Sequence, residues 1–450
     1  MNEKVEQGSA KFLRRRLAYY LEMLSISRHN QDRQQEMACL SQLATINEKF
    51  FHLPQALEFH KRLLTLSQKI DAKDWQEVAL YNLGNCYRQL SQFHESIKYF
   101  VQLVEITLET GNRVLQIAGI WGQGTNYQNL GHYQKAIECF QNQLAISCEM
   151  NERSWQKSAL GSLGNVYQFI GDYNASLAYE RKALLIAREM RDMKATGDSL
   201  ANLGSVYLQL QQWQKAIEFC NQSLSIAKDL DNKNLLMISL NSLGHAYKGL
   251  SLYKKATEFL KAALKISDEI GEKRVRSAIL QGLSDVCSQT NQLEQAIACN
   301  RESLNISVEI GNKFGEAAAL SRIASIYQSQ GKTDQTLAYY KQSLAILQDI
   351  GAKQSQQQLL FSIGGIYYRE QKYSQARECF ESALSLAQEL KITSEEAKVA
   401  LALGAVFHRL NIPSEAIFHY RLAYKIYKTL GDENQAQQML KTMQKLGTDL

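Results

Sequence analysis

One pattern recurs in LGSLGNVYQFIGDYNASLAYERKALLIAREM (160–190), LANLGSVYLQLQQWQKAIEFCNQSLSIAKDL (200–230) and LNSLGHAYKGLSLYKKATEFLKAALKISDEI (240–270). It returns at a shift of 40 residues, and the register holds without insertion or deletion from residue 31 to residue 430. Self-similarity at a fixed period indicates a repeat architecture, in which each unit buries its apolar face against its neighbours. The sequence therefore predicts ten units, at 31–70, 71–110, 111–150, 151–190, 191–230, 231–270, 271–310, 311–350, 351–390 and 391–430.

The first half of each unit has the spacing of an amphipathic helix. A leucine is followed three residues later by another aliphatic residue and four residues after that by an aromatic one, as in Leu160, Leu163 and Tyr167. These spacings place the apolar side chains on one helix face. A glycine inside a helix costs about 1 kcal/mol relative to alanine, so its recurrence predicts a close crossing by a second helix. The recurring glycines are Gly84, Gly124, Gly164, Gly204, Gly244, Gly364 and Gly404.

The second half of each unit is a second helix, separated from the first by a break such as GHY at 131 or GDY at 171. Small residues such as Ala136 and Ala216 make room for the crossing. The helix is predicted to end in a left-handed cap, for which glycine is the favoured residue. The predicted caps are Gly111, Asn151, Asp231, Gly271, Gly311, Gly351 and Gly431. Each unit is therefore a pair of antiparallel helices, with capping helices expected in 1–30 and 431–450.

Composition agrees with one continuous helical array. The 450 residues include only two prolines, Pro54 and Pro413, which argues against linkers between globular domains. The hydrophobic fraction of 45% and the net charge of +6 argue against disorder. No apolar run is long enough to span a membrane, and the polar start has no signal-peptide core, so a cytoplasmic protein is expected. The scattered cysteines suggest buried apolar side chains in a reducing compartment.

The repeated L-G-x-x-Y motif, followed by a small residue, an aromatic residue and A/S-L, resembles the tetratricopeptide repeat (TPR). The resemblance covers about nine-tenths of the chain. It implies an all-α fold, a right-handed α-solenoid superhelix of antiparallel helix pairs. The unit departs from the standard in having 40 residues rather than 34 and no proline at the end of the second helix. This longer form is similar to repeats of Pins-like adaptors and of bacterial, especially cyanobacterial-type, TPR signalling proteins.

In TPR-like solenoids the first helix of each pair lines the concave surface, so the face opposite its apolar stripe is the predicted binding site. That face carries amides, which bind a peptide backbone, together with aromatic anchors and arginines that pair with carboxylates. The predicted groove residues are Tyr81, Asn82, Asn85, Gln89, Trp121, Asn129, Asn165, Asn202, Asn241, His245, Gln281, Arg322, Phe361 and Arg369. By resemblance, Asn85 and Asn165 occupy the position where related grooves hold an extended peptide. The same face also includes Phe169, Asp198, Gln209, Asp285, Gln289, Lys398 and Arg409.

The sequence argues against catalysis and cofactor binding. The eight histidines show no metal-ligand spacing, and neither a phosphate-binding glycine loop nor a G-x-S-x-G motif is present. No enzyme activity, cofactor or metal is therefore expected. The unit at 271–310 is degenerate, with Ser284 and Cys287 at the glycine and aromatic positions, which indicates either neutral drift or a softer joint.

Three functions follow as hypotheses. The leading one is a non-catalytic scaffold or adaptor that binds a peptide or helix of a partner protein in the groove. The alternative is a ligand- or peptide-responsive signalling regulator that changes its superhelical pitch to control a transcription factor or kinase. Nucleic-acid binding is a minor third, because the basic charge is spread out apart from Arg14, Arg15 and Arg16. No membrane insertion is expected, and the sequence leaves the oligomeric state open.

Overall fold

A computed structural model of the chain describes residues 2–50 and 52–445, and these residues form 22 α-helices and no β-strand. The helices are α1 (Asn2–His29), α2 (Arg33–Lys49), α3 (Leu53–Lys69), α4 (Lys73–Gln89), α5 (Phe93–Thr110), α6 (Arg113–Asn129), α7 (Tyr133–Glu149), α8 (Arg153–Ile170), α9 (Tyr173–Glu189), α10 (Met193–Gln209), α11 (Trp213–Asp229), α12 (Lys233–Gly249), α13 (Tyr253–Ile270), α14 (Lys273–Gln289), α15 (Leu293–Glu309), α16 (Lys313–Ser329), α17 (Thr333–Asp349), α18 (Lys353–Arg369), α19 (Tyr373–Glu389), α20 (Thr393–Arg409), α21 (Pro413–Thr429) and α22 (Glu433–Lys445).

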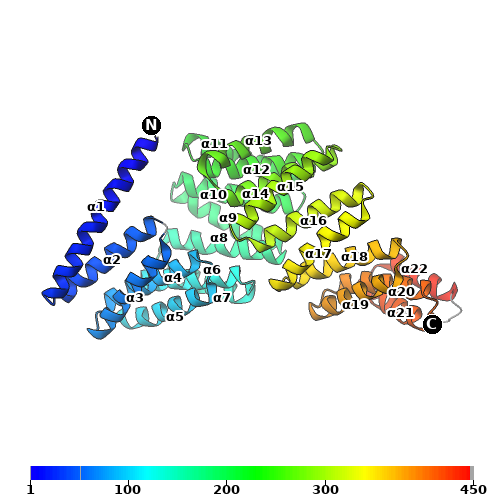
Figure 1. The fold of residues 1–450 in the computed structure, drawn as a ribbon, viewed down its shortest axis with the longest axis horizontal. Helices are drawn as coiled ribbons and strands as arrows, with labels where there is room; N and C mark the ends of the chain where they lie inside the picture. The colour runs from blue at the N-terminus through cyan, green and yellow to red at the C-terminus, as the bar shows by residue number, and fades with distance from the viewer. Residues whose placement is uncertain (1, 51, 446–450) are drawn as a thin grey trace. The chain divides into compact units, whose positions relative to one another are not determined.

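The all-α array of helix pairs predicted from the repeat is confirmed (Figure 1). The short turns make neighbouring helices antiparallel, and consecutive helices pack side by side, as α4 does with α5 and α16 with α17. The chain forms two compact units, residues 1–235 and residues 236–450, and α12 spans the boundary between them. In the predicted cap regions, α1 occupies most of 1–30, and α22 lies in 431–450, of which 446–450 are outside the described residues.

The helix ends confirm the predicted caps. Gly111 and Gly271 lie in the left-handed region, with φ of 74° and 71°. Asn151 and Asp231 adopt the same conformation, with φ of 56° and 47°. A left-handed residue ends a helix because it turns the chain away from the helix axis while the preceding carbonyl groups still accept hydrogen bonds.

The recurring glycines lie at close crossings within the pairs, as predicted. A Cβ atom on Gly84 would stand 2.8 Å from the ring carbons of Phe100, and one on Gly364 would stand 2.7 Å from Phe380. The ring of Phe100 is fully buried. It also faces Gly122, where a Cβ would be 2.5 Å away. The missing side chain of the glycine thus leaves space on the first helix. A large side chain 16 residues later, on the second helix, fills this space.

Replacing Gly84 with Ala is expected to lower the free energy of unfolding by about 1 to 3 kcal/mol, because the added methyl group overpacks the buried Phe100 ring. Gly161 is the matched control, since it lies inside α8 with nothing within 4 Å of an added Cβ. Gly161→Ala should instead stabilise the chain by about 1 kcal/mol through helix propensity. Urea unfolding followed by tryptophan fluorescence measures both changes. Equal effects at the two positions would contradict the close crossing.

Within each of the two compact units, 1–235 and 236–450, the first helices of neighbouring pairs also contact one another. In residues 1–235 α2 contacts α4, α4 contacts α6, α6 contacts α8 and α8 contacts α10; in residues 236–450 α14 contacts α16. In residues 1–235 the first helices therefore form a layer, and in residues 236–450 α14 and α16 lie side by side. The predicted site residues lie on first helices.

The cysteines only partly follow the prediction of burial. Cys39, Cys86 and Cys220 are buried, whereas Cys148 is exposed. The remaining four are half-buried at the surface of second or first helices. A cysteine is small enough that burial depends on the neighbouring pair, and the 40-residue pattern does not specify that environment.

Candidate functional site

In residues 1–235 the predicted groove side chains lie on first helices and none of them is fully buried. Several are engaged with neighbours. The Asn85 Oδ1 accepts a hydrogen bond of 3.1 Å from Arg88, whose guanidinium stands 5.2 Å from the Trp121 ring. Tyr81 contacts Phe100 edge-on. The others are the half-buried Asn82, Asn165 and Asn202 and the exposed Gln89 and Asn129.

In residues 236–450 the predicted side chains separate into two sets. Gln281 donates to Ser303 Oγ at 3.3 Å, and Phe361 packs against Phe380, so these two support the helix pairs. Arg369 is exposed and donates to the Gly365 carbonyl of its own helix. Asn241 is half-buried on α12. Arg322, by contrast, lines a cavity, and its charge acts on His245.

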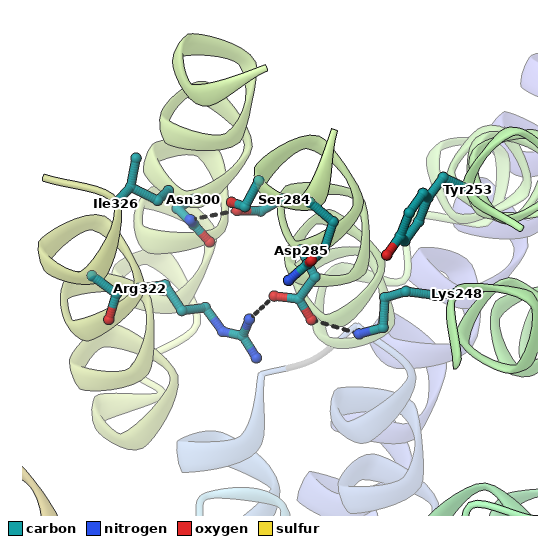
Figure 2. A pocket seen from close by; sticks show the side chains of 10 residues that line it. Lys248, Tyr253, Ser284, Asp285, Asn300, Arg322 and Ile326 are labelled. Carbon is teal, nitrogen blue, oxygen red and sulfur yellow. Dashed lines mark hydrogen bonds and ion pairs between the residues drawn. The ribbon is translucent and has the colours of Figure 1, made fainter. Parts of the chain in front are cut away.

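This cavity, of about 470 Å³, lies among α12 to α16 (Figure 2). Its size is within the range of pockets that hold ligands. Three charged side chains line it: Lys248, Asp285 and Arg322. The other lining residues are Tyr253, Ser284, Ser288, Gln289, Asn300, Ser325 and Ile326.

Asp285 lies between the two cations (Figure 2). Lys248 Nζ donates to Asp285 Oδ2 at 2.6 Å, and Arg322 Nη1 donates to Asp285 Oδ1. The three side chains are 26% to 39% exposed, so the bridge remains in contact with solvent and contributes little to stability. Its effect is geometric, because the carboxylate holds an ammonium and a guanidinium at fixed positions. The charged lining has one anion and two cations and is therefore net positive.

His245 lies beside this network and is neutral at pH 7. Its ring approaches the backbone of α14, since a Cβ on Gly282 would stand 3.1 Å from His245 Cε1. The pKa of His245 is lowered to about 4, chiefly by burial and also by the charges of Lys248 and Arg322, while Asp285 partly opposes the shift. The net positive charge of the cavity therefore comes from Lys248 and Arg322.

A polar pair replaces the usual apolar packing at the wall of the cavity. Ser284 and Asn300 occupy the positions of Gly244 and Leu260, or of Gly364 and Phe380, in other pairs. Asn300 is fully buried and donates from Nδ2 to Ser284 Oγ at 2.6 Å. Its Oδ1 is buried without a hydrogen-bond partner among the described residues. Asparagine fills less volume than phenylalanine or leucine, so this pair leaves space at the cavity.

A second cavity, of about 290 Å³, lies among α16, α17 and α18 and shares Ser325 with the first. Phe314, Leu347 and Leu359 give it apolar walls. Several serines also line it, and two of them, Ser321 and Ser343, are hydrogen-bonded to each other at 2.8 Å. The pair of cavities therefore presents a charged region next to a more apolar one.

Arg322, Asp285 and Gln289 of the predicted face line this cavity, whereas Lys248, Tyr253 and Asn300 were not predicted. The available signal was the degenerate unit at 271–310, in which Ser284 stands at the glycine position and Asn300 at a position that holds phenylalanine in three other units. Of the two interpretations given to that unit, neither anticipated a cavity.

The fold defines a protein of the helical-repeat class. A tetratricopeptide repeat family profile matches residues 116–189, 196–269, 239–309, 275–349 and 355–429, and a second tetratricopeptide repeat profile matches 79–114. Together they cover more than half of the chain, which belongs to the tetratricopeptide repeat family. No curated protein sequence matches the chain.

Solved structures share the fold at low identity. A human IFIT1 dimer with PPP-AAAA is 15% identical with a TM-score of 0.55, and the match covers 91% of each chain. A Rap protein complexed with competence and sporulation factor is 13% identical with a TM-score of 0.51, over 79% of this chain and 99% of that one. A STAND protein with a tetratricopeptide repeat sensor from Pyrococcus horikoshii is 12% identical with a TM-score of 0.54, and the match covers 76% of this chain and 55% of that one.

Tetratricopeptide repeats generally bind peptides or proteins and are not catalytic, and the family match indicates no enzyme family. None of the described helices combines the length and apolar character that crossing a bilayer requires.

Proposed function

We propose that the chain is an interaction scaffold that binds a partner protein through its first-helix layer. The observation that supports this most is the cavity at Asp285, which gives the predicted groove face a defined recognition point in residues 236–450. The group that fits it best is the carboxylate of an acidic residue in an extended peptide.

The argument rests on donors that the Asp285 bridge leaves available. A guanidinium has five N–H donors and an ammonium has three. Asp285 uses one from Arg322 and one from Lys248. A second carboxylate can therefore bind the same two cations without displacing the first, and it would compensate the positive charge.

The second cavity supports a further requirement on the peptide. Because the two cavities share Ser325, adjacent side chains of one extended peptide can reach both. Phe314, Leu347 and Leu359 suit an apolar side chain. The proposed recognition motif is therefore an acidic residue close to an apolar one.

Replacing Arg322 with Ser is expected to weaken the binding of such peptides by about tenfold, because one charge-assisted interaction is lost at a partly exposed site. Serine is the residue of other units at this position, as in Ser162 and Ser362, so the fold should tolerate it. The measurement is retention of the full chain on an array of immobilised peptides that vary the order of acidic and apolar residues.

Arg301→Ala is the matched control, because Arg301 is exposed on α15 and does not line the cavity. It should leave peptide retention unchanged. Equal binding by wild type and Arg322→Ser, or no preference for acidic peptides, would contradict the proposal. Replacing Asn85 and Asn165 with Ala in addition tests whether the predicted groove in residues 1–235 takes part.

The alternative of a ligand-responsive regulator stays a prediction, as does the likeness to Pins-like adaptors and bacterial signalling proteins. Scattering by the full chain with and without a bound array peptide distinguishes the regulator from a rigid scaffold. An unchanged radius of gyration in saturating peptide would count against the regulator.

A further inference from the structure

Three side chains with metal-binding atoms meet in residues 1–235, on helices that do not line the Asp285 cavity. They are Glu48 at the end of α2, His60 in α3 and Cys86 in α4. Their ligand atoms lie within 4.8 Å of one another. His60 Nε2 is 2.9 Å from Glu48 Oε1, and Cys86 Sγ donates to the same oxygen at 3.2 Å.

Each of the three differs from the residue that recurs most often at the same position in the other units. His60 stands where Phe100, Phe140 and Phe380 stand, and Cys86 stands where valine recurs, as at Val166. Glu48 stands where glutamine recurs, as at Gln128, Gln168 and Gln328. His60 and Cys86 are fully buried, and the Glu48 side chain is 27% exposed. Packing alone would be satisfied by the residues of the other units.

We propose that Glu48, His60 and Cys86 form a binding site for one Zn²⁺ ion, with solvent as the fourth ligand. Nitrogen, sulfur and oxygen from histidine, cysteine and a carboxylate are the donors that Zn²⁺ takes in tetrahedral sites. Mg²⁺ and Ca²⁺ prefer all-oxygen ligands, so this donor set disfavours them.

The separations suit a tetrahedral ion. Ligands at about 2.0 Å for nitrogen and oxygen and about 2.3 Å for sulfur stand roughly 3.3 to 3.5 Å apart around a tetrahedral metal. The two separations from Glu48 Oε1, 2.9 Å to His60 Nε2 and 3.2 Å to Cys86 Sγ, are a few tenths of an ångström shorter than this. The third, between His60 Nε2 and Cys86 Sγ, is within 4.8 Å. The partly exposed Glu48 gives the ion a route from solvent.

The charges and protons also balance. On binding, Cys86 releases its thiol proton to solvent, and the hydrogen of His60 lies on Nδ1 so that Nε2 can coordinate. In the metal-free protein Nε2–H donates to Glu48 Oε1, so Zn²⁺ binding replaces this hydrogen bond with coordination of both atoms. The hydrogen then lies on Nδ1, which is buried with no hydrogen-bond partner among the described residues. One Zn²⁺, one thiolate, one carboxylate and one neutral imidazole sum to zero charge, which lowers the cost of burying the ion.

The test is titration of the metal-stripped full chain with Zn²⁺ against a chromophoric chelator, and with Co²⁺ as a spectroscopic substitute. Wild type should bind one Zn²⁺ at this site, and its Co²⁺ form should show a thiolate-to-metal charge-transfer band with tetrahedral ligand-field bands. Cys86→Val should lose the thiolate band, and both Cys86→Val and His60→Phe should lose more than about tenfold in Zn²⁺ affinity.

The array itself supplies folded replacements and a control. Val and Phe are the residues of other units at these two positions, so both variants should keep the helical circular dichroism of wild type. Glu48→Gln, at the partly exposed ligand, repeats the test if either buried variant fails to fold. Cys39→Ala removes a buried cysteine outside the cluster and should bind Zn²⁺ as wild type does. No bound Zn²⁺, or a thiolate band that survives in Cys86→Val, would overturn the site.

Discussion

Replacing Glu180 with Gln is expected to raise the free energy of unfolding at pH 8 by on the order of 4 kcal/mol. Glu180 occupies the position on α9 that packs against Gly164, where a Cβ would stand 2.7 Å from its Oε1. The residue is only 1% exposed. Burial raises the pKa of Glu180 to about 8, although the hydrogen bond from Asn202 and the charge of Lys157 act in the opposite direction.

The sign follows from proton binding. The folded chain holds the Glu180 proton up to about pH 8, whereas the unfolded chain releases it near its ordinary pKa of 4.5. Stability from this group is therefore present below pH 4.5 and is lost as pH rises toward 8. Glutamine has no such loss, and its carbonyl oxygen can still accept from Asn202 Nδ2, which lies 3.2 Å from Glu180 Oε1 in the wild type.

Urea unfolding at a series of pH values, followed by tryptophan fluorescence, measures this effect. Glu180 lies in the compact unit 1–235, and so do all four tryptophans of the chain: Trp75, Trp121, Trp155 and Trp213. Tryptophan fluorescence therefore reports the unfolding of the compact unit that contains Glu180. Glu105→Gln, at an exposed position of α5, is the control and should leave the wild-type pH dependence in place. The same slope between pH 4.5 and 8 in wild type and Glu180→Gln would contradict the prediction.

The second large effect is a loss of stability at low pH. Wild type is expected to lose about 3 kcal/mol more stability than His245→Asn between pH 7 and pH 4. The folded chain keeps His245 neutral down to a pKa of about 4, whereas the unfolded chain protonates it near 6.5. Below pH 6.5 the unfolded state binds more protons than the folded state does, so the free energy of unfolding decreases as the pH is lowered. Asparagine is the residue of other units at this position, as in Asn85 and Asn165.

The measurement is the difference between the two proteins, since other groups titrate in the same range. Wild type and His245→Asn are equilibrated in urea at each pH and then pulse-labelled by hydrogen exchange at one fixed pH. Mass spectrometry of peptides from residues 236–270 then gives the unfolded fraction. His408→Asn, at an exposed position of α20, is the control and should behave as wild type. Acid unfolding curves that coincide for wild type and His245→Asn would show that His245 is not held neutral by the fold.

Both groups illustrate what the repeat pattern can and cannot specify. The pattern predicts that position 180 is buried, because Phe140 and Leu260 are buried at the same position. It does not predict how a carboxyl group there is satisfied, since the partner Asn202 comes from the next pair and lies 22 residues away. The predicted groove residue Asn202 is therefore partly committed to Glu180.

The Asp285 cavity shows the same limit. Sequence reasoning placed Asp285, His245 and Arg322 on one face, because a helical period assigns faces. The Lys248–Asp285 and Arg322–Asp285 bridges span 37 residues each and depend on how neighbouring pairs are offset. The Glu48, His60 and Cys86 cluster depends on three helices, and no histidine or cysteine spacing along the chain indicates it.

By itself the sequence determined the helix pairs, their 40-residue period, the left-handed caps and the close crossings at glycine. These features depend on local conformation and on periodicity, which a repeated pattern encodes many times over. Only the tertiary structure decided where polar exceptions to the pattern meet, as at Asn300 beside Ser284 and at Glu48 beside His60 and Cys86. These contacts depend on how one helix pair packs on the next. Each of these residues occurs once in the chain, so the repeated pattern does not encode its contacts.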